Sequence, residues 1–511
     1  MHDILSKMAE KTPNNSLDGA RESDATYDHV IKYTGLFGGV QGITMLVSVA
    51  RNKIVSELLG PSGLAIINLF NNATRLINQS TDFGISFSAV KHVAELFDRG
   101  TEEEVRDFVR TVRTFCLMAG LLGMLVCLAL CHQVSYWTFE SYDYTWDFAL
   151  LSLLVCMMAV QGGEMAILKG LKKLKKVAVI SVFGAIAILV ICTPIYYFWR
   201  LDGIVYSLVL SGLAVLAIHL HESNKVIPWH VSLFSKQDYT RGIPMVKLGI
   251  GYIIAGIFGQ GAEYIIRTLI LRFGELADVG LYTSGYTLAV SYANLVFVAF
   301  EADYFPRLSA SQHDPKRMNQ TINQQIEVGT LLMAPLLTLF VLAMPILVPL
   351  LFSSKFVDAV PMAICASFYI FFKALTLPTA YLALAKGDSR MYMMTELIYD
   401  VFIAVAIPFA FKWWGLEGAG WALSLAGFID MLLIHTLYSI QYRYRLDWSK
   451  LKFYVAQFFC FTVAVLTALH ENPMMKVITA VMLIASTLIS FVVLKKETNI
   501  LSKLKKRLWR K

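Results

Sequence analysis

The sequence predicts an all-α membrane protein that crosses the bilayer many times. The chain has 511 residues, of which 56% are hydrophobic and 16% charged, and its mean hydropathy is +0.57. Soluble domains contain more charge and less apolar surface. Apolar runs of about 20 residues, the length that crosses roughly 30 Å of hydrocarbon, recur along the whole chain. We expect helices because backbone polar groups in lipid must be satisfied within each segment.

About fourteen apolar spans can be placed along the sequence. They cover residues 33–57, 63–90, 108–132, 147–168, 177–198, 202–221, 243–271, 280–304, 325–352, 358–385, 391–411, 416–440, 451–469 and 474–494. The polar segment 1–30 before them is a predicted cytoplasmic tail, because it lacks the apolar core of a cleavable signal. The basic segment 495–511 is a second predicted cytoplasmic tail, which we expect to lie on anionic headgroups.

The connections between the spans differ in charge, and this difference predicts their orientation. Basic stretches such as "KGLKKLKK" (169–176) and "YRYRLDWSKLK" (442–452) fall on one side, whereas the connection 132–147 on the other side contains no Lys or Arg. By the positive-inside rule, the basic side and both termini are cytoplasmic. The net charge of +8 then needs no nucleic-acid partner.

A weak internal repeat divides the chain into two lobes. "WRLDG" (199–203) is similar to "WGLEG" (414–418), and "LKG" (168–170) to "AKG" (385–387), at nearly the same offset. Six spans separate the copies, so both lobes have the same orientation across the membrane. The predicted organisation is therefore an N-lobe (31–222), a cytoplasmic linker (223–242), a C-lobe (243–441), two further spans (442–494) and the two tails.

No arrangement of residues typical of an enzyme or of a cofactor site occurs in the sequence. The seven cysteines all lie within predicted apolar spans, where they read as small hydrophobic residues. The sequence contains no glycine-rich phosphate loop of the P-loop type, and no Ser-His-Asp triad can be identified in it. We therefore expect a protein without cofactor, metal site or catalytic activity.

Several short motifs resemble a known family. They are "SELLGPSGLA" (56–65), "YFPRLS" (304–309), "LLFSSKF" (350–356), "LALAKGDSRMYMMTEL" (382–397) and "GLEGAGWALS" (415–424). The chain after about residue 30 resembles the Wzx-type O-antigen and lipid III flippases. These form the polysaccharide transporter branch of the multidrug/oligosaccharidyl-lipid/polysaccharide (MOP) exporter superfamily.

The resemblance implies both a fold and a function. The implied fold is two pseudo-symmetric six-helix lobes plus two C-terminal helices. The implied activity is transfer of an undecaprenyl-diphosphate-linked oligosaccharide, such as an O-antigen repeat unit of lipopolysaccharide, from the cytoplasmic to the periplasmic leaflet of the bacterial inner membrane by alternating access. The implied partners are that lipid-linked substrate and membrane lipids, with a glycan polymerase and chain-length proteins as further candidates.

The second span carries an unusual stripe of polar residues. On a helix, these residues fall three and four positions apart: Asn68, Asn71, Asn72, Arg75, Gln79 and Asp82. A charge near the bilayer centre usually faces a water-filled cavity or other protein. A cavity would place Arg75 against phosphate and the amides against sugar hydroxyls. The alternative is a structural network between packed helices, such as Arg75 with Asp82.

Two further basic positions match each other in the repeat. Arg51 corresponds to Arg267, which lies four residues after Glu263. One interpretation is a pair of cations flanking the mouth of a central cleft. The other is an internal Arg267–Glu263 ion pair, with the Arg51 side chain extending separately to the membrane–water interface.

The remaining candidates lie in the C-lobe. Lys373 stands near the centre of its span without a carboxylate in the adjacent turns, so we expect it to face a cavity or to pair with another helix. Together with Arg75 from the other lobe it could clamp a diphosphate. Asp82, Glu263, Asp400 and Asp430 are candidates for ion coupling, because a buried carboxylate can take up a proton near neutral pH. The alternative is a structural role for these acids, either pairing with a basic residue on the cytoplasmic side or hydrogen bonding between helices.

Two other functions remain to be tested against these expectations. A cation-coupled multidrug or small-molecule antiporter of the same superfamily predicts acids in the cavity, since such cargo is usually cationic. A glycan polymerase or ligase predicts a long loop outside the membrane, but the longest predicted outer connection is 132–147.

Overall fold

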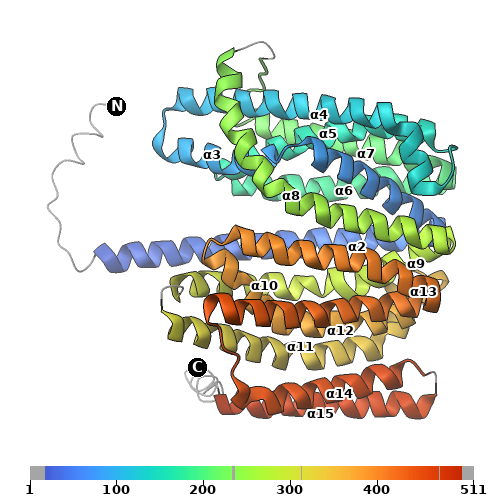
Figure 1. Ribbon diagram of the computed structural model, residues 1–511. Helices are drawn as coiled ribbons and strands as arrows, with labels where there is room; N and C mark the ends of the chain where they lie inside the picture. Colours follow the sequence, from blue (N-terminus) through green and yellow to red (C-terminus); the bar gives the residue numbers. More distant parts are fainter. Residues whose placement is uncertain (1–17, 233–235, 312–313, 471, 498–511) are drawn as a thin grey trace, which may run out of the picture.

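The computed structural model describes residues 18–232, 236–311, 314–470 and 472–497, and this part of the chain is helical throughout, without a strand (Figure 1). The main helices are α2 (Asp18–Thr81), α3 (Ile85–Arg99), α4 (Glu102–Phe139), α5 (Thr145–Gly170), α6 (Leu174–Trp199), α7 (Ile204–Asn224), α8 (Lys236–Phe273), α9 (Leu276–Tyr286), α10 (Asn294–Ser311), α11 (Pro315–Leu351), α12 (Val360–Ala385), α13 (Ser389–Tyr442), α14 (Leu451–Ala468) and α15 (Pro473–Glu497).

Long helices account for most of the predicted membrane spans, although α8, which contains the predicted span 243–271, is not among the described segments that are long and apolar enough to cross a membrane. Within the described residues, nine helical segments are long and apolar enough to cross a membrane, or ten if the bent α9–α10 pair is one span. Three of these segments are long enough for two crossings, and each is broken in the middle: at Gly60 in α2, at the turn Arg200–Gly203 between α6 and α7, and at Gly415 in α13. Gly60 and Gly415 adopt φ values of 68° and 61°, which favour glycine.

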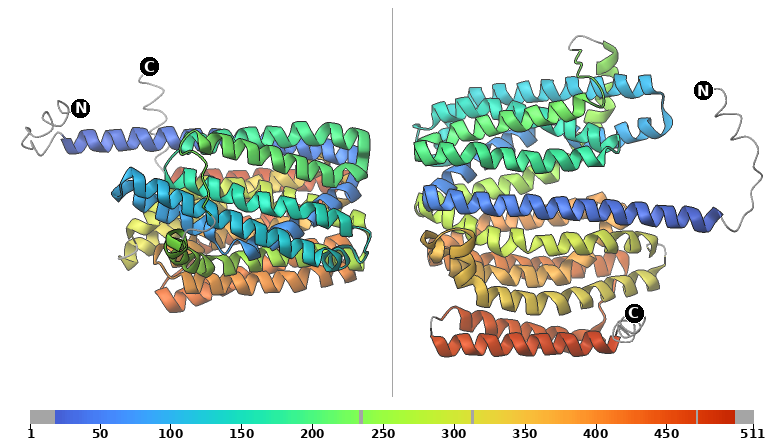
Figure 2. Two further views of the ribbon diagram at one scale, coloured as in Figure 1. Left: turned by 90° about the horizontal axis from the view of Figure 1, so that it is seen from above. Right: turned by 180° about the vertical axis from the view of Figure 1, so that it is seen from behind.

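The N-lobe (α2–α7) and the C-lobe (α8–α13) lie side by side, with the α14–α15 hairpin against α11 on the outer face of the C-lobe (Figures 1 and 2). At the matching positions of the predicted repeat, Gly203 and Gly418 each lie against the tryptophan four positions earlier, Trp199 and Trp414. The described chain begins and ends at the same end of the bundle (Figure 1), as an even number of spans requires. Of the two predicted tails, residues 1–17 and 498–511 lie outside the described residues, whereas 18–30 belong to α2 and 495–497 to α15.

The hydrophobic core is joined at one end of the bundle and divided at the other. One large cluster contains residues of both lobes, among them Phe70, Phe148, Tyr282 and Phe356. At the end that carries "KGLKKLKK", the core consists of smaller clusters, among them one formed by α3–α5 together with Met245 of α8 and one around α10–α13. The two lobes therefore share their largest core at the end opposite the basic connections, while at the basic end, among the described residues, α8 alone of the C-lobe packs on the N-lobe cluster.

Polar contacts between the lobes occur at that same joined end. Lys53 Nζ donates to the Pro349 carbonyl at 2.8 Å. The hydroxyls of Thr138 and Tyr264 lie 2.8 Å apart, and Arg272 Nε lies 3.2 Å from Glu140 Oε1. These contacts hold the lobes together on the side that the basic residues predict to be periplasmic.

Candidate functional site: two cavities at the lobe interface and in the C-lobe

A cavity of about 530 Å³ lies beside the break between α2 and α3, where α8 faces the N-lobe. We call it the interlobe cavity. Its polar lining comes from both lobes: Arg75, Asn78, Gln79, Asp82, Ser86 and Gln260. The polar stripe of the second span thus faces a cavity over part of its length.

The helix carrying this stripe is not continuous, which corrects the expected single span 63–90. Helix α2 ends at Thr81 and α3 starts at Ile85, because Phe83 and Gly84 take positive φ values of 50° and 67°. The break lets the backbone of Gly84 meet the backbone of Gly249 on α8, so closely that a Cβ at either glycine would overlap the other chain. The α8 helix therefore seats directly on the break.

Arg75 is exposed in the interlobe cavity. The charged side chains whose fields reach it are Glu263, Arg51 and Arg267. Arg267 is already paired, since its Nη1 lies 3.2 Å from Glu263 Oε2 and 3.0 Å from the Glu263 carbonyl. Within the described residues, neither Arg75 nor Arg51 has a carboxylate partner, and the hydrogen bond of Arg51 is to Asn52 at 3.5 Å. Arg75 is therefore a guanidinium in the cavity without a direct carboxylate partner in the described chain, and the nearest compensating charge acting on it is that of Glu263, which is already paired with Arg267.

The Arg267–Glu263 pair matches the internal-pair interpretation of this position. Arg267 is 5% exposed, and its guanidinium carbon lies 5.9 Å from the ring centres of both Tyr282 and Tyr286. Such cation–π contacts add to the ion pair when they are desolvated. Arg267 therefore contributes charge to the neighbourhood of Arg75 while its own side chain is held in place.

The asparagines of the stripe do not line the interlobe cavity. Asn68 and Asn71 donate to the carbonyls of Leu64 and Ile67, one turn earlier on their own helix. Asn72 is buried, and its Nδ2 has no hydrogen-bond partner within the described residues. Only the stripe's end, Arg75, Gln79 and Asp82, reaches the cavity.

Asp82 lies in the break before α3, and its carboxylate faces the first turn of that helix. It is 8% exposed, and its carboxylate accepts from the Ser86 backbone N–H at 3.3 Å and from the Ser86 hydroxyl at 3.2 Å. A carboxylate near a helix N-terminus is stabilised by the free N–H groups there. This contact gives Asp82 a structural role beside the ion-coupling role that the sequence allows.

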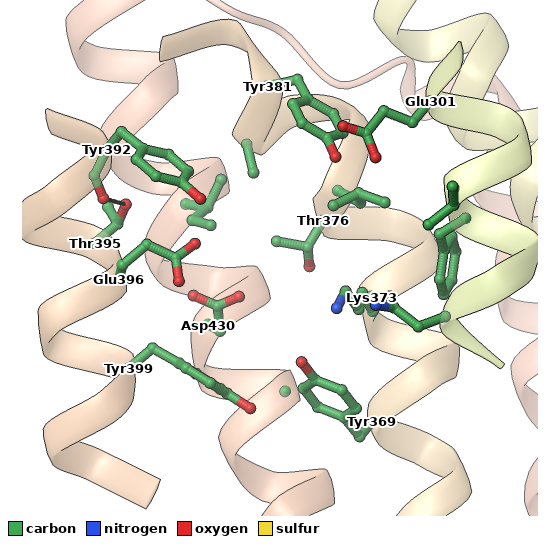
Figure 3. Close-up of a pocket in the computed structure, with 17 residues that line it drawn as sticks. Glu301, Tyr369, Lys373, Thr376, Tyr381, Tyr392, Thr395, Glu396, Tyr399 and Asp430 are labelled. Atoms are coloured by element: carbon green, nitrogen blue, oxygen red, sulfur yellow. Dashed lines mark hydrogen bonds between the residues drawn. The ribbon is translucent and has the colours of Figure 1, made fainter. Parts of the chain in front are cut away.

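A second cavity, of about 300 Å³, lies within the C-lobe, among α10, α12 and α13 (Figure 3). We call it the C-lobe cavity. The predicted residues Lys373 and Asp430 line it. Asp400 does not, and lies instead on α13 opposite Gly259 of α8. The other polar lining residues were absent from the sequence-based candidates: Asn294, Glu301, Tyr369, Thr376, Tyr381, Tyr392, Thr395, Glu396 and Tyr399.

Arg75 and Lys373 line different cavities, so the structure does not bring them together as the two jaws of one clamp. The reason is that α12 lies inside the C-lobe against α13, while α8 stands between the C-lobe and the polar stripe of α2. Within the described residues, no group of three or more His, Cys, Asp or Glu side chains could hold a metal ion.

The lining of the C-lobe cavity has a sequence signal of its own. Tyr369, Lys373 and Thr376 are three and four positions apart on α12, and so are Tyr392, Glu396 and Tyr399 on α13. Each set is a polar stripe on an otherwise apolar helix. Such spacing indicates a stripe that faces the interior of the bundle. Tyrosines are also common at membrane–water interfaces, so the pattern alone does not distinguish a cavity lining from interface residues.

The chain is similar to a family model and to several solved membrane-protein structures. Residues 54–361 match the family model described as polysaccharide biosynthesis protein. The lipid II flippase MurJ, in an inward closed conformation, has a TM-score of 0.67 and 13% identity, over 90% of this chain and 99% of that one. An inward-facing multidrug resistance MATE family transporter of the MOP superfamily has a TM-score of 0.65 and 12% identity, over 78% and 96%. No curated protein sequence matches the chain.

A third structural relative is described by the polarity of its binding pocket. It is a MOP superfamily transporter from Pyrococcus furiosus, described by the reverse polarity of its binding pocket, with a TM-score of 0.57 and 12% identity, over 81% of this chain and 95% of that one. Identities this low establish the fold alone, whereas the family model covers more than half of the sequence. The chain is a multi-pass membrane protein with the MOP-type fold, and it belongs to the polysaccharide biosynthesis protein family, as its motifs predicted.

Proposed function

We propose that this protein is a flippase that moves an undecaprenyl-diphosphate-linked oligosaccharide from the cytoplasmic to the periplasmic leaflet. The observation that carries the proposal is Arg75, which lines the interlobe cavity and forms no ion pair within the described chain, with the charge of Arg51 close enough to act on it. A diphosphate supplies two negative charges and several acceptor oxygens, which the forked donors of arginine suit.

The lobe arrangement gives this site a direction. The lobes share one core and several polar contacts at the end of Lys53 and Arg272, whereas at the end with the basic connections the α10–α13 cluster is separate from the cluster of α3–α5 and α8. With the basic end and both termini in the cytoplasm, the cavity is positioned for loading from the inner leaflet of the bacterial inner membrane. Rocking of the lobes would then expose the headgroup to the periplasm.

The test is depletion of the protein in its native cell, followed by extraction of lipids. A flippase predicts that an undecaprenyl-diphosphate oligosaccharide accumulates on the cytoplasmic leaflet. Arg75→Ala is expected to clear it about tenfold more slowly or worse, because a hydrogen bond to a charged group is worth roughly 1.5–3 kcal/mol. Arg106→Ala, at a 68% exposed arginine of α4 outside both cavities, is the matched control. Normal lipid levels and normal surface glycan after depletion would refute the proposal.

A second candidate function is favoured by the C-lobe cavity. Three carboxylates line it, Glu301, Glu396 and Asp430, and acids in a cavity suit the cationic cargo of a coupled antiporter. Under this candidate, cells with the protein would extrude a cationic dye such as ethidium faster than depleted cells, and Glu396→Gln would abolish the difference. Equal dye efflux together with accumulated lipid-linked glycan excludes the antiporter.

Surface-polysaccharide assembly also implies partners. A flippase of this kind delivers its substrate to a periplasmic polymerase with its chain-length protein, so these are the proposed neighbours in the membrane. The proposed activity is transport without bond making, and needs no cofactor.

A further inference from the structure

We propose that the C-lobe cavity is a sugar-binding subsite that takes one ring of the oligosaccharide, and that this ring carries no acidic group. The inference rests on the proposed function, because it assumes that the diphosphate of the same substrate lies at Arg75. It assigns the glycan head and the diphosphate to two separate cavities, each with its own chemistry.

The first argument is the position of the polar side chains. Figure 3 shows Tyr399, Glu396 and Asp430 of α13 facing Tyr369 and Thr376 of α12 across one open space. All come from the C-lobe, so the subsite keeps its shape when the lobes move as rigid bodies. A ring bound here can travel with the C-lobe during transport.

The second argument is the aromatic lining. The rings of Tyr369 and Tyr399 lie 6.2 Å apart at an interplanar angle of 28°, and Tyr381 and Tyr392 line the same cavity. A sugar ring has an apolar C–H face and an edge of hydroxyls. Tyrosine matches both parts, since its ring presents a negative π-face and its hydroxyl donates and accepts hydrogen bonds.

The third argument is charge. Glu301, Glu396 and Asp430 set three carboxylates against one ammonium, that of Lys373. The Lys373 Nζ lies 5.6 Å from the centre of the Tyr369 ring, and within the described residues it forms no ion pair. Carboxylates that face a cavity accept readily from sugar hydroxyls or an amine, but they repel a phosphate or a uronic acid. The acidic excess therefore selects a neutral or amino-bearing ring.

The fourth argument is size. The cavity of about 300 Å³ lies at the lower limit for small-molecule sites, which are about 300–1,000 Å³. It suits one ring and excludes a whole repeat unit. The remaining sugars must therefore lie outside this cavity.

The experiment uses the full-length protein in nanodiscs and two probes. One probe is the free oligosaccharide released by mild acid from the lipids of depleted cells, observed by saturation-transfer NMR. The other is undecaprenyl diphosphate without sugar. The variants are Tyr399→Ala and Glu396→Gln in the C-lobe cavity and Arg75→Gln in the interlobe cavity. Tyr206→Ala, at a 60% exposed tyrosine of α7, is the matched control.

We expect the free oligosaccharide to bind the wild type, with saturation concentrated on one non-acidic ring. Tyr399→Ala and Glu396→Gln should weaken that binding about tenfold and leave undecaprenyl diphosphate binding unchanged. Arg75→Gln should do the reverse, and Tyr206→Ala should change neither.

Other outcomes overturn the inference, and they distinguish it from the proposed function. Undecaprenyl diphosphate binding without oligosaccharide binding, or saturation on a uronic acid, refutes the sugar subsite alone. Binding of neither probe refutes the flippase as well. Binding of a cationic dye that Glu396→Gln abolishes, without oligosaccharide binding, assigns the cavity to a cation.

Discussion

Arg113 of α4 and Glu164 of α5 form an ion pair that is almost completely buried, with 2% and 1% of their side chains exposed and 2.8 Å between Nε and Oε1. The remaining donors of Arg113 reach the carbonyls of Pro228 and Ile227 at 2.7 and 3.1 Å. One guanidinium therefore neutralises a buried acid and ties the first part of the interlobe linker to the N-lobe.

Removing Arg113 should destabilise the protein strongly. Arg113→Ala leaves the Glu164 carboxylate buried without its counter-ion, and breaking one side of such a pair typically costs about 3–5 kcal/mol. Thermal unfolding in detergent measures the effect. Arg106→Ala breaks an exposed α4 pair with Glu102, which is worth at most about 1 kcal/mol. Equal melting temperatures for the two variants would contradict the assigned role of the buried pair.

The close approach of α8 to the α2–α3 break gives a second prediction. Gly249→Ala adds a Cβ that overlaps the backbone of Phe83 and Gly84, and overpacking of this kind costs about 1–3 kcal/mol. Gly261→Ala on the same helix adds a Cβ with nothing within 4 Å, so it should be neutral or stabilising. Differential scanning fluorimetry of both variants checks this. A melting temperature for Gly249→Ala at or above that of Gly261→Ala would show that the two backbones do not meet.

Sequence patterns predicted the elements of this fold better than the sites between them. The breaks at Gly60 and Gly415 lie in the predicted connections, and the Arg267–Glu263 pair follows from a spacing of four. Both are local features, set by residues close in the chain. The contact of Gly84 with Gly249 was not predictable, because it joins residues far apart in sequence.

The same limit applies to the candidate site. The pattern placed Arg75 and Lys373 on polar faces, but which face looks into which cavity depends on how the lobes pack. Asn68 and Asn71 lie on the predicted stripe yet bond to their own helix, since a short amide side chain can reach the carbonyl one turn back.

The contact between Arg272 and Glu140 predicts a conformational effect. Glu140→Arg places two positive charges together at the joined end of the lobes. The population of molecules in which the lobes are separated at this end should therefore rise severalfold, in line with about 1 kcal/mol for an exposed pair. Double electron–electron resonance should then report longer distances between spin labels at positions 142 and 412 than in the wild type. The exchanged pair Glu140→Arg with Arg272→Glu should restore the original distribution. Longer distances that persist in the exchanged pair would argue against this contact as a latch.

Acid should weaken the connection between α12 and α13 through Asp388. The Met391 backbone N–H at 3.0 Å and the Tyr442 hydroxyl at 2.8 Å hold the pKa of Asp388 below its ordinary value. A lowered pKa in the fold means that the carboxylate stabilises it above the unfolded pKa of about 3.9, and that this stability is lost as pH falls through the folded-state pKa.

The measurement for Asp388 is the melting temperature of the wild type and of Asp388→Asn between about pH 5 and pH 3. We expect the two curves to converge as the pH falls, because the variant has no carboxylate to lose there. Asp447 also has a lowered pKa, so both proteins will retain some acid sensitivity. Curves that stay parallel over this range would show that Asp388 contributes nothing to it.

Translocation in proteoliposomes tests the central claim most directly. The lipid-linked oligosaccharide isolated from depleted cells is loaded in one leaflet, and its arrival in the other is followed with a membrane-impermeant glycosidase. The account predicts rapid transfer by the wild type and by Arg106→Ala, and transfer slowed about tenfold or more by Arg75→Ala. Equal transfer of an analogue with an uncharged linker in place of the diphosphate, or full activity of Arg75→Ala, would contradict it.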